Sequence, residues 1–262
     1  MIIRLINKLK NSFCNMSKGK ILLITLLSFF LNACTDNRDE DTWLVATSAD
    51  NPPYEYMHNG EIVGFDIDLM IEIGRHLGKK VEFKNMEFHG LLAALASDNV
   101  DMVVAAMSIT PERLARVDFS IPYTDAMVAI LYREEDKLSS KKDLKEKIVG
   151  AQLGTIWSLI AHNMSSKYNF SIKSLSNNLM LVEELKNNRI DAIIIEKSQV
   201  MKFIEKNPEL ASFSVKKHVS SFAIALPKDS PLKNNIDHAI ESLKRKGTIE
   251  ALSKKWGLLG AE

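Results

Sequence analysis

The chain has 262 residues, which is enough for one large domain or two small ones. Apolar residues make up 46% and charged residues 26%, so a sizeable buried core is expected and global disorder is disfavoured. A formal net charge of +1 offers no electrostatic basis for binding nucleic acid, and two cysteines cannot build a disulfide scaffold.

The charge is unevenly distributed along the chain. Residues 1–33 carry five basic side chains and no acidic one, so the other 229 residues hold 29 basic and 33 acidic side chains. Their net charge is −4. The near-neutral total therefore averages a basic N-terminus with an acidic remainder.

The N-terminus has the features of an export signal. Lys18 and Lys20 precede the apolar run Ile21 to Leu31. This run is too short to span a bilayer comfortably, since a transmembrane helix needs about 20 residues. A basic segment followed by a short apolar segment is typical of a secretory signal. The run ends in the sequence Leu-Asn-Ala-Cys at residues 31–34, which resembles a bacterial lipobox.

We therefore predict a signal peptide over residues 1–33, lipidation of Cys34, and a polar tether over residues 34–42. Two acyl chains would anchor the protein stably to a membrane. An ordinary signal peptide or a buried apolar helix are the alternatives. Because Met16 directly precedes a compact signal, we also hypothesise that residues 1–15 are an upstream extension from a misassigned start. The mature fold would then contain no thiol.

From Trp43 onward, short apolar runs alternate with helical periodicity, which is typical of an α/β fold. The predicted strands cover residues 43–47, 81–83, 102–106, 148–151, 170–175, 190–195 and 222–226. The predicted helices cover residues 65–77, 91–95, 155–168, 179–187, 197–205, 231–246 and 248–256. Pro231 suits a first helical turn and Gly247 suits a break between helices. Residues 133–147 are charged and predict a change of lobe.

Several enzyme motifs are missing from the sequence. It contains no P-loop, GxGxxG, GxSxG or HExxH pattern, and its six histidines are dispersed without metal-ligand spacing. We therefore expect no cofactor and no metal. These observations disfavour a phosphate-using, metal-dependent or serine-hydrolase enzyme.

Six ordered segments carry a resemblance to a known family. They are, in chain order, 46–56 with 64–69, 87–95, 106–123, 152–155, 189–196 and 247–257. The most specific of them is 106–123, which contains Ser-Ile-Thr-Pro-Glu-Arg at residues 108–113. Together these segments resemble bacterial solute-binding proteins of family 3, the periplasmic amino-acid-binding proteins of ABC importers. The resemblance extends from about Trp43 to Gly257.

This resemblance implies a two-lobed, type II periplasmic-binding-protein-like α/β fold, with a ligand cleft between lobes joined by two crossing strands. We expect lobe 1 at residues 43–130 plus 224–262, lobe 2 at 131–223, and crossings near 126–133 and 220–227. It further implies a monomeric, membrane-anchored lipoprotein of the periplasm or cell surface. Its partners would be a free amino acid and ABC permease subunits, and not nucleic acid.

A buried amino acid needs partners for its two charged groups. The planar guanidinium of Arg113 suits a bidentate bond to the carboxylate, and the resemblance assigns it that role. Ser108 and Thr155 would add hydroxyl and N–H donors, and the predicted helix N-terminus at Thr155 favours an anion. The alternative for Arg113 is a surface cation on a short helix.

The ammonium group needs a carboxylate and a carbonyl oxygen, which the resemblance assigns to Glu196 and Ala106. The alternative for Glu196 is an acid at a helix N-terminus, stabilised by the helix dipole. Phe88 matches an aromatic residue that packs on the ligand side chain, and the alternative is a core phenylalanine. We expect Asp66 and Asp68 to start and solvate a helix rather than contact ligand.

The sequence departs from the family pattern at two positions. Many relatives carry an acid or amide at the position of Ser48 and an aromatic residue at that of Asn51, so one face of the usual aromatic sandwich is missing. Asp50 and Glu87 are the nearest acids for a basic ligand side chain, and the sequence places neither of them.

Gln152 before Leu-Gly-Thr makes the chain most similar to arginine-binding members. Arginine is therefore the leading ligand, and lysine, histidine, ornithine and glutamine remain open. The complete predicted substrate-binding set is Ser48, Asn51, Phe88, Ala106, Met107, Ser108, Arg113, Gln152, Thr155, Ile156 and Glu196.

Two other functions remain open at this point. Cyclohexadienyl dehydratases resemble family-3 binding proteins, and such an enzyme would need an acid–base group such as Glu196 or His89 beside the ligand. The second is a ligand-sensing domain that works with a separate partner. Neither is the main prediction, which is a non-enzymatic receptor.

Overall fold

The computed structural model describes residues 41–258, without the side chains of residues 216–219. The predicted signal peptide, Cys34 and most of the predicted tether lie outside the described residues. Thr42, the last residue of that tether, is the first residue of strand β1 (Thr42–Thr47). In residues 41–258, no helix has both the length and the apolar character to cross a membrane.

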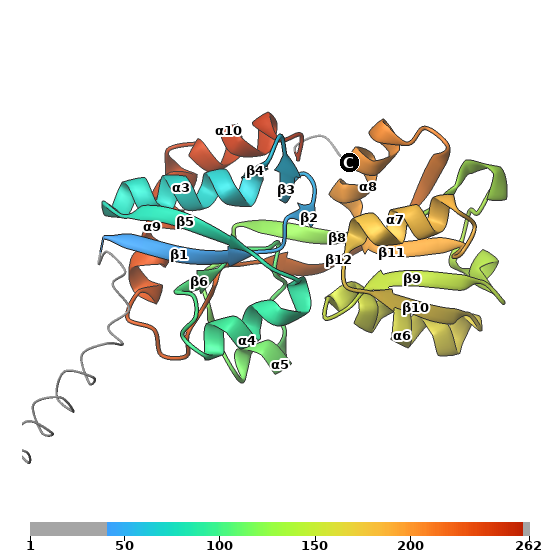
Figure 1. Ribbon diagram of the computed structural model, residues 1–262, viewed down its shortest axis with the longest axis horizontal. Helices are drawn as coiled ribbons and strands as arrows, with labels where there is room; N and C mark the ends of the chain where they lie inside the picture. The colour runs from blue at the N-terminus through green and yellow to red at the C-terminus, as the bar shows by residue number, and fades with distance from the viewer. Residues whose placement is uncertain (1–40, 259–262) are drawn as a thin grey trace, which may run out of the picture. The chain divides into compact units, whose positions relative to one another are not determined.

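The first of two five-stranded sheets has the order β5-β1-β6-β13-β7. Its other strands are β5 (Lys80–Asn85), β6 (Met102–Val103), β7 (Asp118–Phe119) and β13 (Ala225–Leu226). One face is covered by α3 (Phe65–Leu77), α9 (Lys233–Arg245) and α10 (Thr248–Lys255), and the other by α4 (Leu91–Ala96) and α5 (Pro111–Leu114) (Figure 1). A small sheet of β2 (Asp50–Asn51), β3 (Glu55–His58) and β4 (Glu61–Val63) connects β1 to α3.

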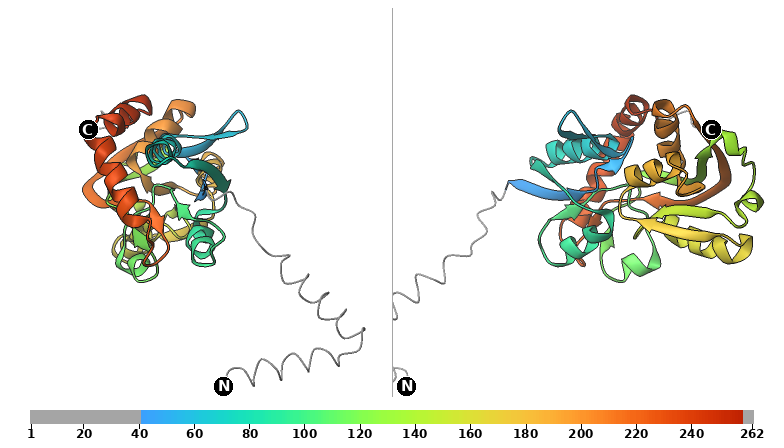
Figure 2. Two further views of the ribbon diagram at one scale, coloured as in Figure 1. Left: turned by 90° about the vertical axis from the view of Figure 1, so that its left-hand side faces the viewer. Right: turned by 45° about the vertical axis from the view of Figure 1, so that its right-hand side comes forward.

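The second sheet has the order β10-β9-β11-β8-β12. These strands are β8 (Thr124–Arg133), β9 (Ile148–Gln152), β10 (Ser171–Leu175), β11 (Ala192–Glu196) and β12 (Leu210–Phe222). Helix α6 (Ile156–Tyr168) covers one face, and α7 (Asn178–Lys186) and α8 (Lys197–Lys206) cover the other (Figures 1 and 2). Three 3₁₀ helices, η1 (Phe88–Gly90), η2 (Glu134–Asp136) and η3 (Lys141–Leu144), lie in the connections.

The chain crosses between the sheets twice. It leaves the first sheet between β7 and β8 and returns between β12 and β13, and β8 and β12 pair antiparallel along their lengths. The two crossings are joined where Tyr123 N donates to Phe222 O at 3.0 Å. Each sheet with its helices therefore forms one lobe, and the first lobe is built from two separate parts of the chain.

Local sequence explains the main helices. In α3, Phe65, Leu69 and Ile73 share one helical face and are fully buried, and Gly78 ends the helix in the left-handed conformation. Thr155 caps α6 by accepting a hydrogen bond from Ser158 N. In α5, Thr110 is the cap and Pro111 occupies the first helical position.

Three local predictions are wrong. The predicted strand 222–226 is divided, because β12 ends at Phe222 in the second sheet and β13 lies in the first. Strand 102–106 ends at Val103, since the backbone reaches a positive φ of 41° at Ala106. Pro231 precedes its helix, which begins at Lys233 after an N-cap at Leu232.

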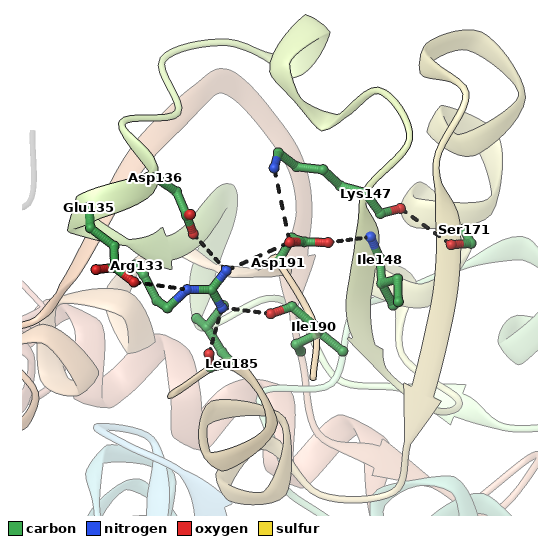
Figure 3. A network of polar contacts seen from close by, with 9 residues as sticks. All are labelled: Arg133, Glu135, Asp136, Lys147, Ile148, Ser171, Leu185, Ile190 and Asp191. Carbon is green, nitrogen blue, oxygen red and sulfur yellow. Dashed lines mark hydrogen bonds and ion pairs between the residues drawn. The ribbon is translucent and has the colours of Figure 1, made fainter. Parts of the chain in front are cut away.

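Arg133 lies at the end of β8 away from the crossings. Figure 3 shows the network of polar contacts around its guanidinium. Arg133 is 7% exposed and donates through Nη1 to Leu185 O at 2.6 Å and Ile190 O at 2.7 Å. Its Nη2 lies 2.7 Å from Asp136 Oδ2 and 3.6 Å from Asp191 Oδ1. The guanidinium therefore satisfies the carbonyls on both sides of the α7–β11 turn.

Replacing Arg133 with methionine is expected to lower the free energy of unfolding by about 3–5 kcal/mol, because buried carbonyls and a carboxylate lose their donor. Urea unfolding measures this loss. Arg189→Met is the control, since Arg189 is 54% exposed and pairs with Glu184 at the surface, where such pairs contribute about 0–1 kcal/mol. An equal, small loss in both variants would contradict the structural role of Arg133.

Candidate functional site

A cavity lies where the two lobes meet, and in this structure its open volume is about 10 Å³. That is room for roughly one water molecule. Among the described residues that line it, Arg113 is the only base and Asp50 the only acid. The complete lining is Asp50, Asn51, Phe88, Ala105, Ala106, Ser108, Arg113, Gln152, Thr155, Ile156, Trp157, Gln199 and Phe222.

Arg113 reaches from α5 in the first lobe to the second lobe. Its Nη1 donates to Ser108 O at 2.6 Å, and its Nη2 donates to Gly154 O at 3.0 Å. The guanidinium carbon lies 5.5 Å from the ring centroid of Phe88, within cation–π distance. Burial lowers the pKa of Arg113 to about 10, while Glu112 opposes this effect. Arg113 therefore remains a cation at neutral pH.

The N-terminus of α6 lies at the same cavity. Thr155 Oγ1 accepts from Ser158 N at 3.3 Å and donates to Gln152 O at 2.7 Å, which fixes the first turn. Thr155, Ile156 and Trp157 all line the cavity. The free N–H groups and the dipole of a helix N-terminus attract anions. Together with Arg113, this end of α6 is suited to bind a carboxylate from both lobes.

Asp50 is the centre of a buried polar network between the lobes. Its Oδ2 accepts from Gln152 Nε2 at 2.9 Å and from Asn178 N at 2.7 Å, and its Oδ1 accepts from the Ser48 hydroxyl at 3.2 Å. Gln152 Oε1 in turn accepts from Asn178 Nδ2 at 2.9 Å. Burial raises the pKa of Asp50 to about 6, and nearby Glu87 also raises it, while the hydrogen bonds lower it.

Two buried acids support the cavity wall from behind. Asp66 was expected to be solvated, but it is fully buried, and its Oδ2 accepts from Ala106 N at 2.6 Å and from Tyr123 OH at 2.8 Å. Glu55 Oε1 accepts from Asn51 Nδ2 at 2.7 Å. Burial raises the pKa of both carboxyls, that of Asp66 to about 6. Asp66 raises the pKa of Glu55 further, whereas a hydrogen bond with Glu55 lowers the pKa of Asp66. The pair therefore positions Ala106 and Asn51 without a cation.

Most of the predicted binding residues are brought together. The cavity is lined by Asn51, Phe88, Ala106, Ser108, Arg113, Gln152, Thr155 and Ile156.

Ser48, Met107 and Glu196 do not line the cavity. Ser48 hydrogen-bonds Asp50, and Met107 is buried in the core beside α4. The carboxylate of Glu196 caps α8 by accepting from Ser198 N and Gln199 N, and burial raises its pKa to about 7. The predicted contacts of these residues with a ligand stay predictions.

The sequence did not place all the lining residues. Of the two acids that the sequence offers for a basic ligand side chain, Asp50 lines the cavity. The other, Glu87, is exposed and is not in the lining. Gln199, Ala105, Trp157 and Phe222 were not predicted at all. Gln199 could have been found, because it lies three residues after Glu196 and therefore shares its side of the chain at the start of α8.

Comparison with known proteins gives consistent matches. Residues 44–259 match the family described as bacterial extracellular solute-binding proteins, family 3. The arginine-binding extracellular protein ArtP of Bacillus subtilis (strain 168) is 35% identical over 250 residues, which cover 92% of this chain and 98% of ArtP.

Solved structures also match. An ancestral arginine-binding protein bound to arginine has a TM-score of 0.79 and 36% identity, covering 83% of this chain and 98% of that one. An ancestral amino-acid-binding protein described as a precursor of cyclohexadienyl dehydratase has a TM-score of 0.76 and 33% identity, covering 82% and 95%. The predicted two-lobed, type II α/β fold is confirmed by these matches.

Proposed function

Because this chain belongs to the bacterial extracellular solute-binding proteins of family 3, we propose that it captures a free amino acid, arginine first, and delivers it to an ABC permease. On this proposal the protein is a monomeric receptor outside the cytoplasm, tethered to a membrane through lipid on Cys34. It catalyses no reaction and needs no cofactor.

The observation that carries the proposal is the position of Arg113 opposite the N-terminus of α6. Its bonds to Ser108 O and Gly154 O use one N–H of each terminal nitrogen. A guanidinium has five N–H donors, so two parallel donors can still meet a carboxylate. Ser108 and Thr155 lie beside it in the lining. This arrangement suits the α-carboxylate of an amino acid.

The proposed mechanism is closure of the two lobes around the ligand. Arg113, Ser108 and Phe88 belong to the first lobe, and Thr155 and Glu196 belong to the second. The ligand ammonium would bind Ala106 O. It would also bind the Glu196 carboxylate, once the hydrogen bonds by which Glu196 caps α8 have rearranged. A ligand that contacts both lobes shifts the population toward the closed state by its differential affinity for that state.

Arginine is proposed as the leading ligand for two reasons. Relatives that match this chain over nearly all of their own length are described as arginine-binding. Gln152, the residue that makes the sequence most similar to arginine-binding members, lies in the cavity lining. Lysine, histidine, ornithine and glutamine are the ligands to compare with it. An ancestral protein of this kind has also been solved with glutamine bound.

The dehydratase alternative has weaker support from the site. It needs an acid–base group beside the ligand, but neither of its candidates, His89 and Glu196, is among the described residues that line the cavity. The solved relative connected with that activity is itself described as an amino-acid-binding protein.

A thermal-shift screen against the standard amino acids, ornithine, citrulline, arogenate and prephenate tests the proposal. A ligand at 100 times its Kd adds about 2.7 kcal/mol of stability, which a melting curve resolves. We expect the largest shift with L-arginine and no turnover of arogenate or prephenate. No shift with any amino acid, or turnover of either precursor, would overturn the proposal.

A further inference from the structure

Two buried amide oxygens of the cavity lining are without a hydrogen-bond donor. Asn51 is 7% exposed and Gln199 is 2% exposed, and both line the cavity. Within residues 41–258, no donor meets Asn51 Oδ1 or Gln199 Oε1. The Asn51 amide is held in this orientation, because its Nδ2 donates to Glu55 Oε1 at 2.7 Å. A buried acceptor left without a donor is unfavourable, so these oxygens mark where donors should bind.

Asp50 adds a negative charge to the lining of the same cavity. It is 3% exposed, and no described basic side chain forms an ion pair with it. Its partners Gln152, Asn178 and Ser48 are neutral groups. Buried charges are ordinarily paired, which makes a cation the missing partner of Asp50.

These acceptors have to be matched by a group with many N–H donors and a positive charge. A guanidinium has five N–H donors and an ammonium three, whereas a neutral amide offers two and no charge. We propose that Asp50, Asn51 and Gln199 form a subsite that binds the cationic side chain of the ligand and thereby excludes neutral amino acids. This inference rests on the proposed function, since it assumes that the carboxylate is held by Arg113.

The subsite also accounts for the contacts of Glu196 and Glu55. Glu196 accepts from Gln199 N at 3.2 Å, so it fixes the first turn of α8 that carries Gln199. Glu55 fixes the Asn51 amide by accepting a hydrogen bond from Asn51 Nδ2. Both acids are buried. Glu55 would hold an acceptor toward the ligand without contacting it, and Glu196 would position Gln199 in addition to meeting the ligand ammonium.

Asp50→Asn tests the subsite, with L-arginine and citrulline as paired probes. The two molecules share their α-amino and α-carboxyl groups, and citrulline carries a neutral urea in place of the guanidinium. We expect arginine affinity, measured by calorimetry, to fall at least about 30-fold, because a buried charge loses its partner. Citrulline affinity should change by less than about threefold. The ratio of the two affinities is the decisive quantity.

Two further variants complete the design. Gln199→Leu keeps the size of the side chain and removes the acceptor, and it should reduce the arginine-to-citrulline ratio by about 5- to 10-fold. Asp68→Asn makes the same chemical change as Asp50→Asn outside the cavity, where Asp68 binds Lys255 and Trp256. It should leave the ratio unchanged.

A pH series on the unmodified protein gives a second readout if Asp50→Asn fails to fold. The raised pKa of Asp50, about 6, means that its charge is lost on acidification through that value, and Glu87 and Glu55 are the titratable groups that interact with it. Below pH 6 the arginine-to-citrulline ratio should therefore fall by up to tenfold per pH unit. Ligand groups shared by both probes cancel in the ratio.

The outcomes separate this inference from the proposed function. If arginine and citrulline lose affinity equally in Asp50→Asn, then Asp50 contacts the shared α-ammonium, and the subsite is refuted. A pH-independent ratio also refutes it. If the unmodified protein binds no amino acid at all, the proposed function fails instead.

Discussion

Replacing Arg113 with alanine is expected to weaken amino-acid binding by roughly 100-fold to several thousand-fold while the protein stays folded. The guanidinium is the only cation among the described residues that line the cavity, so its loss leaves the ligand carboxylate without a counter-charge. The penalty for such an unpaired buried charge is about 3–5 kcal/mol. Titration calorimetry with L-arginine and with glutamine measures the loss.

The loss should be similar for both ligands, because they share the carboxylate. Arg113→Lys should recover only part of the affinity, since an ammonium cannot form two parallel bonds. Arg116→Ala is the matched control, because Arg116 follows α5, is exposed and lies outside this lining. An Arg113→Ala variant that is folded and retains near-native affinity would refute the carboxylate role.

Replacing Gly64 with alanine is expected to have the largest effect on stability. Gly64 has a φ of 142°, and a Cβ there would lie 2.0 Å from Tyr54 O and 2.5 Å from Tyr54 C. Tyr54 is 1% exposed, and its carbonyl accepts from Asp66 N at 2.9 Å, so this backbone cannot move away easily. We expect a loss of at least about 4 kcal/mol in the free energy of unfolding, which urea unfolding measures.

Gly60→Ala is the control that measures only the cost of placing alanine at a positive φ, without a steric clash. Gly60 also has a positive φ, 86°, but a Cβ there would meet no atom within 4 Å. Its cost should be about 1–2 kcal/mol, the usual penalty for a left-handed non-glycine residue. Equal losses at the two positions would show that the contact with Tyr54 contributes nothing.

The elements with a clear period were predictable. In α3 the apolar residues recur at helical spacing and Gly78 supplies the stop, and the helix runs over Phe65–Leu77 as predicted. Most of β12 was missed, because its pairing partner β8 lies about 80 residues earlier and its sequence is largely polar after Val215. Long-range pairing of this kind leaves little trace in a local pattern.

Some residues of the candidate site were likewise predictable from local sequence, and others depend on contacts with distant segments. Arg113 and Thr155 lie in recognisable local motifs, so the sequence alone is enough to predict both as site residues. Asp50 could not be placed from sequence, because its neighbours Gln152 and Asn178 come from the other lobe. Asp66 was expected in solvent, since an acid in a first helical turn is ordinarily exposed. Its burial follows from Ala106 N and Tyr123 OH, which approach it from distant segments.

The most direct test of the account is an equilibrium titration of the purified protein with L-arginine by calorimetry. The account predicts saturable binding with one site per chain and a Kd in the micromolar range or tighter, about −8 kcal/mol or more favourable. It also predicts that the other basic amino acids compete for that site. Absence of binding by arginine and by every other standard amino acid would contradict it.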